Sequence, residues 1–323
     1  MGARFWMGGV EASDLVEIRS DLAALREPGF WAIQGTFEGN WRLARFASVT
    51  QSDFTVDQER SIEVGNWSSS HDRGEYIDYV ERIRSQIAAG EVYQVNACRI
   101  LSAPMKAEGG LTYLMARILA ENPAPFASYL RLDDIEIASA SPERFISITN
   151  GLITTSPIKG TGTTAEFGAK DRAENLMIVD LMRNDLGMVA EVGSITTPRL
   201  LDVEAHPGLF HLVSDVSARL APGSDIVDLL SALMPPGSVS GAPKSSALEL
   251  IAKNEQERGP YCGILGWYEA GRAEIAVAIR TFWLESGNLR FGTGAGITWE
   301  SDASSEWDET ELKCARLIAL ASS

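Results

Sequence analysis

The sequence is poor in cysteine and histidine and has no long hydrophobic run. Its three cysteines, Cys98, Cys262 and Cys314, are widely separated, and no Cys-x-x-Cys or Cys/His ligand spacing occurs. This argues against a disulfide framework and a zinc site. No stretch approaches the roughly 20 apolar residues of a membrane-spanning helix, and residues 1–14 do not read as a signal peptide. We therefore expect a cytoplasmic protein that does not enter a membrane.

Positive charge is also scarce. The chain has 28 Lys and Arg against 44 Asp and Glu, a net charge of -16, and no block of basic residues. Nucleic-acid-binding proteins gather basic residues on one face, so this class of function is disfavoured. An anionic ligand would need local positive charge from a metal ion or from a few well-placed Arg and Lys side chains.

Helix and strand patterns alternate irregularly, which favours an α+β fold over a strictly alternating α/β fold. Helices are expected at about residues 75–89, 111–122, 168–187, 224–233, 243–256 and 303–321. Strands are expected as a hairpin within 29–50, in several segments from 92 to 158, as a pair within 194–220, and as three segments from 261 to 297, the second of them unbroken through residues 273–284. Residues 52–74 are expected to form a loop.

Two pairs of carboxylates lie three residues apart on expected helices, Asp171 with Glu174 and Glu306 with Glu309. Residues at this spacing share one helix face, so two such helices facing each other across a cleft could hold a hard divalent cation. Lys159, in a Pro-Ile-Lys-Gly turn, adds an amine for covalent or base chemistry. Taken singly, each feature has a plainer interpretation, as a solvated helix face or a surface lysine.

Two glycine-containing segments resemble nucleotide-binding loops without matching them. The segment 292–297 reads G-x-G-x-G, and Pro243 precedes Lys244 where a P-loop has glycine. A nucleotide-binding ATPase is therefore disfavoured. The first segment fits a backbone that closely approaches an anionic ligand. The second fits either a helix N-terminus that faces an anion or a plain helix entry.

Two further polar residues lie in apolar surroundings. His211 alternates with apolar neighbours, a pattern more common for a core histidine than for a catalyst. Arg280 lies within an apolar strand pattern, so it either forms a structural ion pair or clamps a carboxylate.

Read together, the motifs resemble a known family. The segments SASPERF, PIKGT, DRAENLMIVDLMRNDLG, HLVS, SGAPK, YCGILGW, AIRTF, GAGI and SSEWDETELK follow the order found in chorismate-utilising enzymes, over residues 74–318. The resemblance implies that family's α+β fold, with two largely antiparallel β-sheet layers, helices outside and a central active-site cleft. It also implies a catalytic domain of residues 74–323, on which a shortened N-terminal strand region, residues 1–73, packs as one continuous unit.

The resemblance implies a set of ligands and binding residues. Mg²⁺ would be bound through Glu174 and Glu306 or Glu309, with Asp171 nearby, and Arg280 would clamp the enolpyruvyl carboxylate of chorismate. The other substrate-binding residues that it implies are Tyr261, Lys313, Ser240, Gly241, Gly294, Ala295 and Gly296.

The resemblance also implies catalytic roles. Glu143 would be the acid that protonates the leaving C4 hydroxyl, Lys159 the nucleophile at C2, and His211 a further catalytic residue. Anthranilate synthases generally have alanine at the Lys159 position, and isochorismate and salicylate synthases have a water-activating lysine at the Gln94 position. Lys159 and Gln94 together favour synthases that form 4-amino-4-deoxychorismate, towards 4-aminobenzoate and folate.

The nitrogen source is expected to lie outside this chain. None of the cysteines lies in a glutaminase-type elbow, so we expect ammonia from a separate glutamine amidotransferase subunit. Anthranilate synthase component I is the main alternative, isochorismate or salicylate synthase a weaker one, and a catalytically idle amidotransferase partner an alternative of another class.

Overall fold

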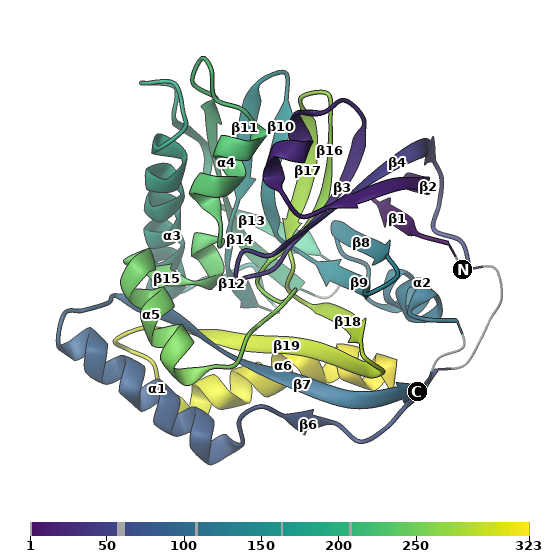
Figure 1. Ribbon diagram of the computed structural model, residues 1–323. Helices are drawn as coiled ribbons and strands as arrows, with labels where there is room; N and C mark the ends of the chain where they lie inside the picture. Colours follow the sequence, from purple (N-terminus) through teal and green to yellow (C-terminus); the bar gives the residue numbers. More distant parts are fainter. Residues whose placement is uncertain (1, 57–61, 107–108, 163, 207–208, 323) are drawn as a thin grey trace.

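The computed structural model describes residues 2–56, 62–106, 109–162, 164–206 and 209–322 (Figure 1). Its helices are α1 (Arg73–Ala88), α2 (Thr112–Glu121), α3 (Ala169–Gly187), α4 (Ile226–Leu233), α5 (Lys244–Asn254) and α6 (Ala303–Ala321), with 3-10 helices η1 (Leu22–Arg26) and η2 (Gly237–Val239). The α-helix bounds differ from the predicted ones by two residues at most. In the described part of the chain, no helix is long and apolar enough to cross a membrane.

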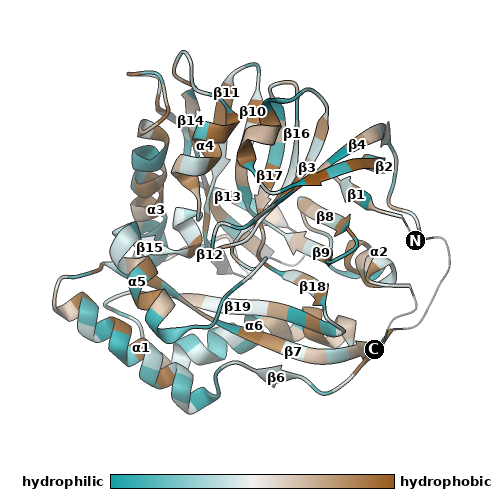
Figure 2. Cartoon of the chain, in the orientation of Figure 1, coloured by the Kyte–Doolittle hydropathy of each residue, from teal (hydrophilic) through white to brown (hydrophobic). Residues whose placement is uncertain are grey.

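Local side chains explain where several helices begin. The Asp72 carboxylate accepts the Glu75 amide, and the Glu75 carboxylate accepts the Asp72 amide, each at 2.9 Å. This capping box satisfies two amides that have no partner within the helix. At α6, Asp302 accepts the Ser305 amide at 2.9 Å. Hydrophilic and hydrophobic residues alternate along α1, as expected for a helix with one buried face (Figure 2).

The strands are all antiparallel to their neighbours and form two arms of one hydrogen-bonded network. The first arm runs in the order β13 (Thr196–His206), β14 (Leu209–Arg219), β11 (Leu152–Ser156), β10 (Arg144–Thr149), β17 (Arg272–Val277), β16 (Ile264–Glu269), β3 (Phe30–Gly35) and β4 (Trp41–Gln51). The second runs in the order β1 (Arg4–Met7), β8 (Phe126–Arg131), β9 (Glu136–Ser141), β18 (Thr281–Glu285), β19 (Asn288–Ile297) and β7 (Gln94–Lys106).

The N-terminal strands join the two arms. β2 (Val10–Arg19) pairs with β4 on one side and with β1 on the other. β12 (Ile158–Gly162) pairs with β14, and β15 (Gly241–Ala242), β5 (Glu63–Val64) and β6 (Ser68–Ser69) pair with β7. The α+β fold with two antiparallel layers is therefore confirmed. The prediction of a loop over residues 52–74 was wrong at β5 and β6, which are too short to show a period.

Two of the places where the chain crosses between the arms lie next to each other. β9 and β10 are separated by Pro142 and Glu143, and β17 and β18 by residues 278–280. The predicted single strand through 273–284 was therefore wrong, because Arg280 has a φ of 51° and breaks it. The crossings are hydrogen bonded side by side, from the Val277 amide to the Glu143 carbonyl at 3.1 Å and from the Ala140 amide to the Arg280 carbonyl at 3.0 Å.

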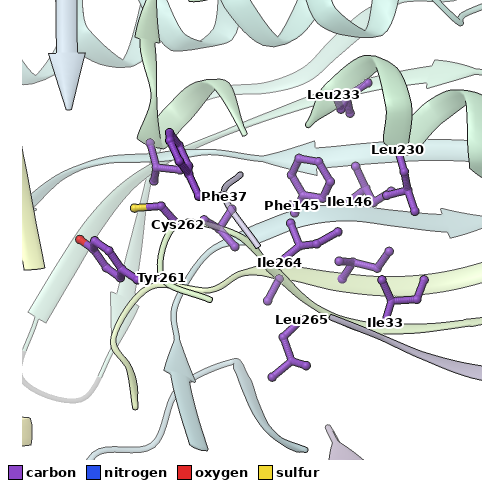
Figure 3. Packing of buried hydrophobic residues seen from close by; sticks show 14 of the residues in the cluster. Ile33, Phe37, Phe145, Ile146, Leu230, Leu233, Tyr261, Cys262, Ile264 and Leu265 are labelled. Atoms are coloured by element: carbon purple, nitrogen blue, oxygen red, sulfur yellow. The ribbon is translucent and has the colours of Figure 1, made fainter. Parts of the chain in front are cut away.

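Two hydrophobic clusters hold the helices on the sheet. In the larger one, Leu230 and Leu233 of α4 join Phe145, Ile146 and Ile264 of the first arm (Figure 3). In the second cluster, Leu114 and Ile118 of α2 and Leu317 of α6 pack with Phe282 and Phe291 of the second arm. The polar residues described next lie where the two arms meet.

Candidate active site

Lys159 provides a partly buried amine at the junction of the arms. It lies on β12, in a strand rather than in the predicted turn, because β12 pairs with β14 on both sides of the positive φ of Gly160. Its Nζ donates to the Ser238 carbonyl oxygen at 3.1 Å. Burial lowers the pKa of this ammonium, while the charges of Glu143 and Glu174 act against that change. A lowered pKa makes the neutral, nucleophilic amine more accessible.

Glu143 provides a buried carboxyl at the first crossing. It is 5% exposed, and its backbone amide donates to the Ser141 hydroxyl at 3.3 Å. Burial raises the pKa of this carboxyl from 4.5 to about 6, against the Ser238 hydroxyl and Lys159, which both favour the ionised form. Glu143 can therefore carry a proton close to neutral pH.

Gln94 and Gly296 bring the second arm to Lys159. A Cβ atom built on Gly296 would lie 2.5 Å from the Gln94 Nε2 and 4.0 Å from the Lys159 Nζ. A side chain at position 296 would therefore occupy the space that Gln94 fills. Gln94 is 1% exposed, and its Oε1 has no hydrogen-bond partner among the residues that the structure describes. A buried acceptor of this kind is costly unless a ligand or water meets it.

Glu174 of α3 and Glu306 of α6 are close enough for the charge of Glu306 to act on Glu174. Burial raises the pKa of both carboxyls, and the charge of Glu306 raises that of Glu174 further. Glu309 differs: although burial acts to raise the pKa of its carboxyl, the Lys313 ammonium, 2.5 Å away, holds it below the ordinary value. Lys313 also donates to the Gly294 carbonyl at 3.0 Å.

Asp171 has a structural partner. Its carboxylate accepts the Gly168 amide at 3.0 Å and caps α3. Within the described ranges, no group of three or more His, Cys, Asp or Glu side chains is arranged to hold a metal ion. Two carboxylates completed by ligand oxygens and water suit Mg²⁺ better than a full protein cage, so the predicted metal ligands remain a prediction.

Arg280 is the cation at the second crossing. Burial lowers the pKa of its guanidinium, and no hydrogen bond or ion pair to it occurs within the described residues. The alternative of a structural ion pair for Arg280 is therefore not supported in this part of the chain. A partly buried guanidinium without a protein partner is suited to a carboxylate ligand.

Several other predicted binding residues have structural contacts. The Ser240 hydroxyl donates to the Pro236 carbonyl at 3.0 Å, and a Cβ on Gly241 would lie 2.2 Å from the Gln94 carbonyl oxygen. The Ala295 side chain belongs to the larger hydrophobic cluster. Binding roles for Ser240, Gly241 and Ala295 stay predictions.

The segment 292–297 is the end of β19 and not a loop. A Cβ on Gly292 would lie 2.0 Å from the Tyr261 ring, which is itself buried. His211 is buried on β14, opposite Thr161 and Glu204 in the pairing register. Catalytic or binding roles for Tyr261 and His211 stay predictions.

Sequence reasoning missed Ser238 and the ion pair between Lys244 and Asp185. Ser238 contacts Lys159 through its carbonyl and Glu143 through its hydroxyl, and the Lys244 Nζ lies 2.6 Å from an Asp185 carboxylate oxygen. The signal available in the sequence was the charge of Lys244 and Asp185 within two of the family-like segments. Nothing in the sequence distinguished Ser238 from a turn serine.

The fold and this junction of amine, carboxyls and guanidinium define the class of protein. A family model described as chorismate binding enzyme matches residues 38–319, and the chain therefore belongs to this family of enzymes.

Individual relatives carry two related names. Aminodeoxychorismate synthase component 1 of Salmonella typhimurium is 40% identical over 267 residues, which cover 78% of this chain and 58% of the relative. Anthranilate synthase component 1 of Aquifex aeolicus is 36% identical over 275 residues, covering 80% of this chain and 55% of the relative. The chain thus spans somewhat more than half the length of these relatives. The crystal structure of anthranilate synthase component I from Streptococcus pneumoniae shares the fold, with a TM-score of 0.81, 24% identity, and coverage of 98% of this chain and 90% of that one.

Proposed function

We propose that the protein aminates chorismate with ammonia, in a Mg²⁺-dependent reaction, to give 4-amino-4-deoxychorismate. The observation that carries this proposal is the partly buried Lys159 amine, with its lowered pKa, beside the Glu143 carboxyl, with its raised pKa. An amine that loses its proton readily and a carboxyl that keeps one are the pair that an addition–elimination reaction requires. The 40% identical relative named aminodeoxychorismate synthase component 1 supports the same choice.

In the proposed reaction, the neutral Lys159 Nζ forms a bond to C2 of the ring. The ring double bonds shift, the C4–O bond breaks, and Glu143 gives its proton to the departing hydroxyl, which leaves as water. Ammonia then forms a bond to C4, the double bonds shift back, and the C2–N bond breaks to release Lys159. The proton that ammonia loses restores the acid form of Glu143. Two successive rearrangements return the substituent to C4.

Substrate binding is proposed to use the two cations at the junction. Arg280, whose guanidinium has no hydrogen-bond or ion-pair partner within the described residues, would hold the enolpyruvyl carboxylate through its guanidinium fork. Lys313 lies near the Gly294 carbonyl and Glu309, at the side of the site where α6 meets β19. Both positions suit a dicarboxylate in a protein of net charge -16.

Glu174 and Glu306 fit a Mg²⁺ ion. They offer oxygen ligands, and their mutual repulsion is opposed at Glu174 by the charge of Lys159 and, more weakly, by that of Lys170, whose Nζ lies 3.9 Å from the carboxylate. When bound, the ion would offset the charge of the substrate's ring carboxylate beside these side chains.

The ammonia is proposed to come from a separate glutamine amidotransferase. Cys98, Cys262 and Cys314 are buried free thiols, and none is placed to attack glutamine. We expect the purified chain to use ammonium salts and to leave glutamine unhydrolysed. Glutamine hydrolysis by this chain alone would refute the need for a partner.

Product analysis tests the reaction. The chain is incubated with chorismate, Mg²⁺ and ammonium, an aminodeoxychorismate lyase is added, and the products are separated by chromatography. We expect 4-aminobenzoate. Formation of 2-aminobenzoate would instead establish anthranilate synthesis, the alternative that the 36% identical relative supports, and an unchanged chorismate pool would indicate an idle partner.

A further inference from the structure

The loop of residues 234–243 brings Ser238 to the centre of the site. It joins α4 to α5 and contains η2 and β15. Ser238, 5% exposed, lies at its middle. The Ser238 carbonyl oxygen accepts the Lys159 Nζ at 3.1 Å, and its hydroxyl faces the Glu143 carboxyl as a hydrogen-bond donor. One residue therefore contacts both groups of the proposed reaction.

Close packing fixes the loop on either side of Ser238. A Cβ on Gly237 would lie 2.6 Å from the Met182 Cε and 2.7 Å from the Leu181 Cδ2, so the loop packs directly against side chains of α3. On the other side, the Arg258 guanidinium donates to the Val239 carbonyl at 2.9 Å. Ser238 thus has little freedom to move within the loop.

A buried ion pair fixes the base of the loop. The Lys244 Nζ lies 2.6 Å from the Asp185 carboxylate and donates to the Leu233 carbonyl at 3.2 Å. The Lys244 and Asp185 side chains are 18% and 7% exposed. These contacts tie together the end of α3, the end of α4 and the start of α5, and α3 also carries Glu174. Removing one member of a buried pair leaves the other charge uncompensated.

We propose that Ser238 is a positioning residue that orients Lys159 and Glu143 together, and that the Lys244–Asp185 ion pair holds the loop in place for this purpose. The inference rests on the proposed function for its meaning. A carbonyl oxygen can only accept, so it takes one N–H of Lys159 and leaves the nitrogen lone pair of the neutral amine free for the substrate. The hydroxyl donates to the carboxylate of Glu143 and so favours its ionised form.

The Ser238 hydroxyl is tested by Ser238→Ala, which keeps the carbonyl, with Ser238→Thr as the conservative variant. The titration of Glu143 is followed by carbon-13 NMR of labelled glutamate, assigned with Glu143→Gln, and requires no substrate. We expect Ser238→Ala to raise the titration midpoint of Glu143, and the pH at which kcat falls, by about one unit, with KM little changed. Ser238→Thr should restore both. An unmoved midpoint in Ser238→Ala, or an equal shift in Ser238→Thr, would refute the role of the hydroxyl.

The ion pair is tested by Lys244→Met, with Lys253→Met as the matched control on the exposed face of the same helix. The pH dependence of acylation of Lys159 is measured by mass spectrometry of the labelled peptide. Release of the loop should let water reach Lys159, so its acylation midpoint should rise, and kcat should fall about 100-fold. Lys253→Met should match the unmodified protein in both measurements.

Equal acylation profiles for Lys244→Met and Lys253→Met would overturn the proposal. If Lys244→Met does not fold, Asp185→Asn, which keeps the shape of the side chain, is measured in the same way and decides the question. The NMR and acylation measurements use no chorismate. They can therefore succeed even if product analysis fails, in which case the positioning role stands and the proposed reaction does not.

Discussion

The sharpest prediction concerns the replacement of Glu143 by Gln. With a pKa of about 6, the Glu143 carboxyl is protonated in about one tenth of the molecules at pH 7. With the ordinary pKa of 4.5 it would be protonated in about three molecules in a thousand. Burial thus supplies the acid form about 30-fold more often at that pH. If Glu143 protonates the leaving hydroxyl, kcat should fall towards alkaline pH, tenfold per unit well above pH 6.

Glu143→Gln keeps the size of the side chain and removes the transferable proton. A positioned general acid typically contributes about 10² to 10⁴ in rate, so we expect kcat to fall by about that factor. The KM for chorismate should change little, because the amide still fills the site. The alkaline fall of kcat should also disappear, since the amide does not titrate.

The assay is steady-state kinetics from pH 5.5 to 8.5, at saturating Mg²⁺ and a constant concentration of free ammonia. Glu136→Gln is the control, since Glu136 is a second buried carboxyl whose pKa burial raises, but it accepts the Leu111 amide at 2.8 Å, away from the arm junction. We expect this variant to lose stability and keep the pH profile. If Glu143→Gln kept more than a tenth of the activity, or kept the alkaline fall, the role of Glu143 as the acid would be refuted.

Three further predictions follow from the same site and core. Lys159→Ala should abolish formation of the 4-amino product, and chromatography should show a little 2-amino product instead. Full retention of 4-amination would refute covalent catalysis by Lys159. Glu174→Gln and Glu306→Gln should each raise the Mg²⁺ concentration for half-maximal activity by about tenfold or more, because mutating even a residue that only hydrogen-bonds to a metal ligand costs about 10- to 100-fold in metal affinity. An unchanged Mg²⁺ titration would place the ion elsewhere. Glu255→Ala should lower the free energy of unfolding by about 3–5 kcal/mol, because it strands the buried Arg258 that it contacts at 2.7 Å; urea denaturation beside the exposed control Glu249→Ala measures this, and equal losses in the two variants would contradict it.

The helices and most strands could be predicted from the sequence because their signals are local. Asp72 and Glu75 mark a helix start through contacts within one turn, and Asn150–Gly151 takes positive φ angles in a hairpin, as these residue types favour. The break at Arg280 could not be predicted in this way. It depends on β17 and β18 pairing with different arms, a non-local choice that leaves the apolar pattern continuous.

The sequence by itself also determined the chemical inventory: one lysine, the acidic pairs on two helices, and the arginine in an apolar segment. Only the tertiary structure decided which of these groups meet. It brought Lys159 of one arm to Gln94 and Gly296 of the other, used Asp171 as a helix cap, and inserted Ser238 between the amine and the acid. The physical reason is that pKa values and contacts in the site depend on burial and on partners from distant segments, neither of which is encoded in the spacing of neighbouring residues.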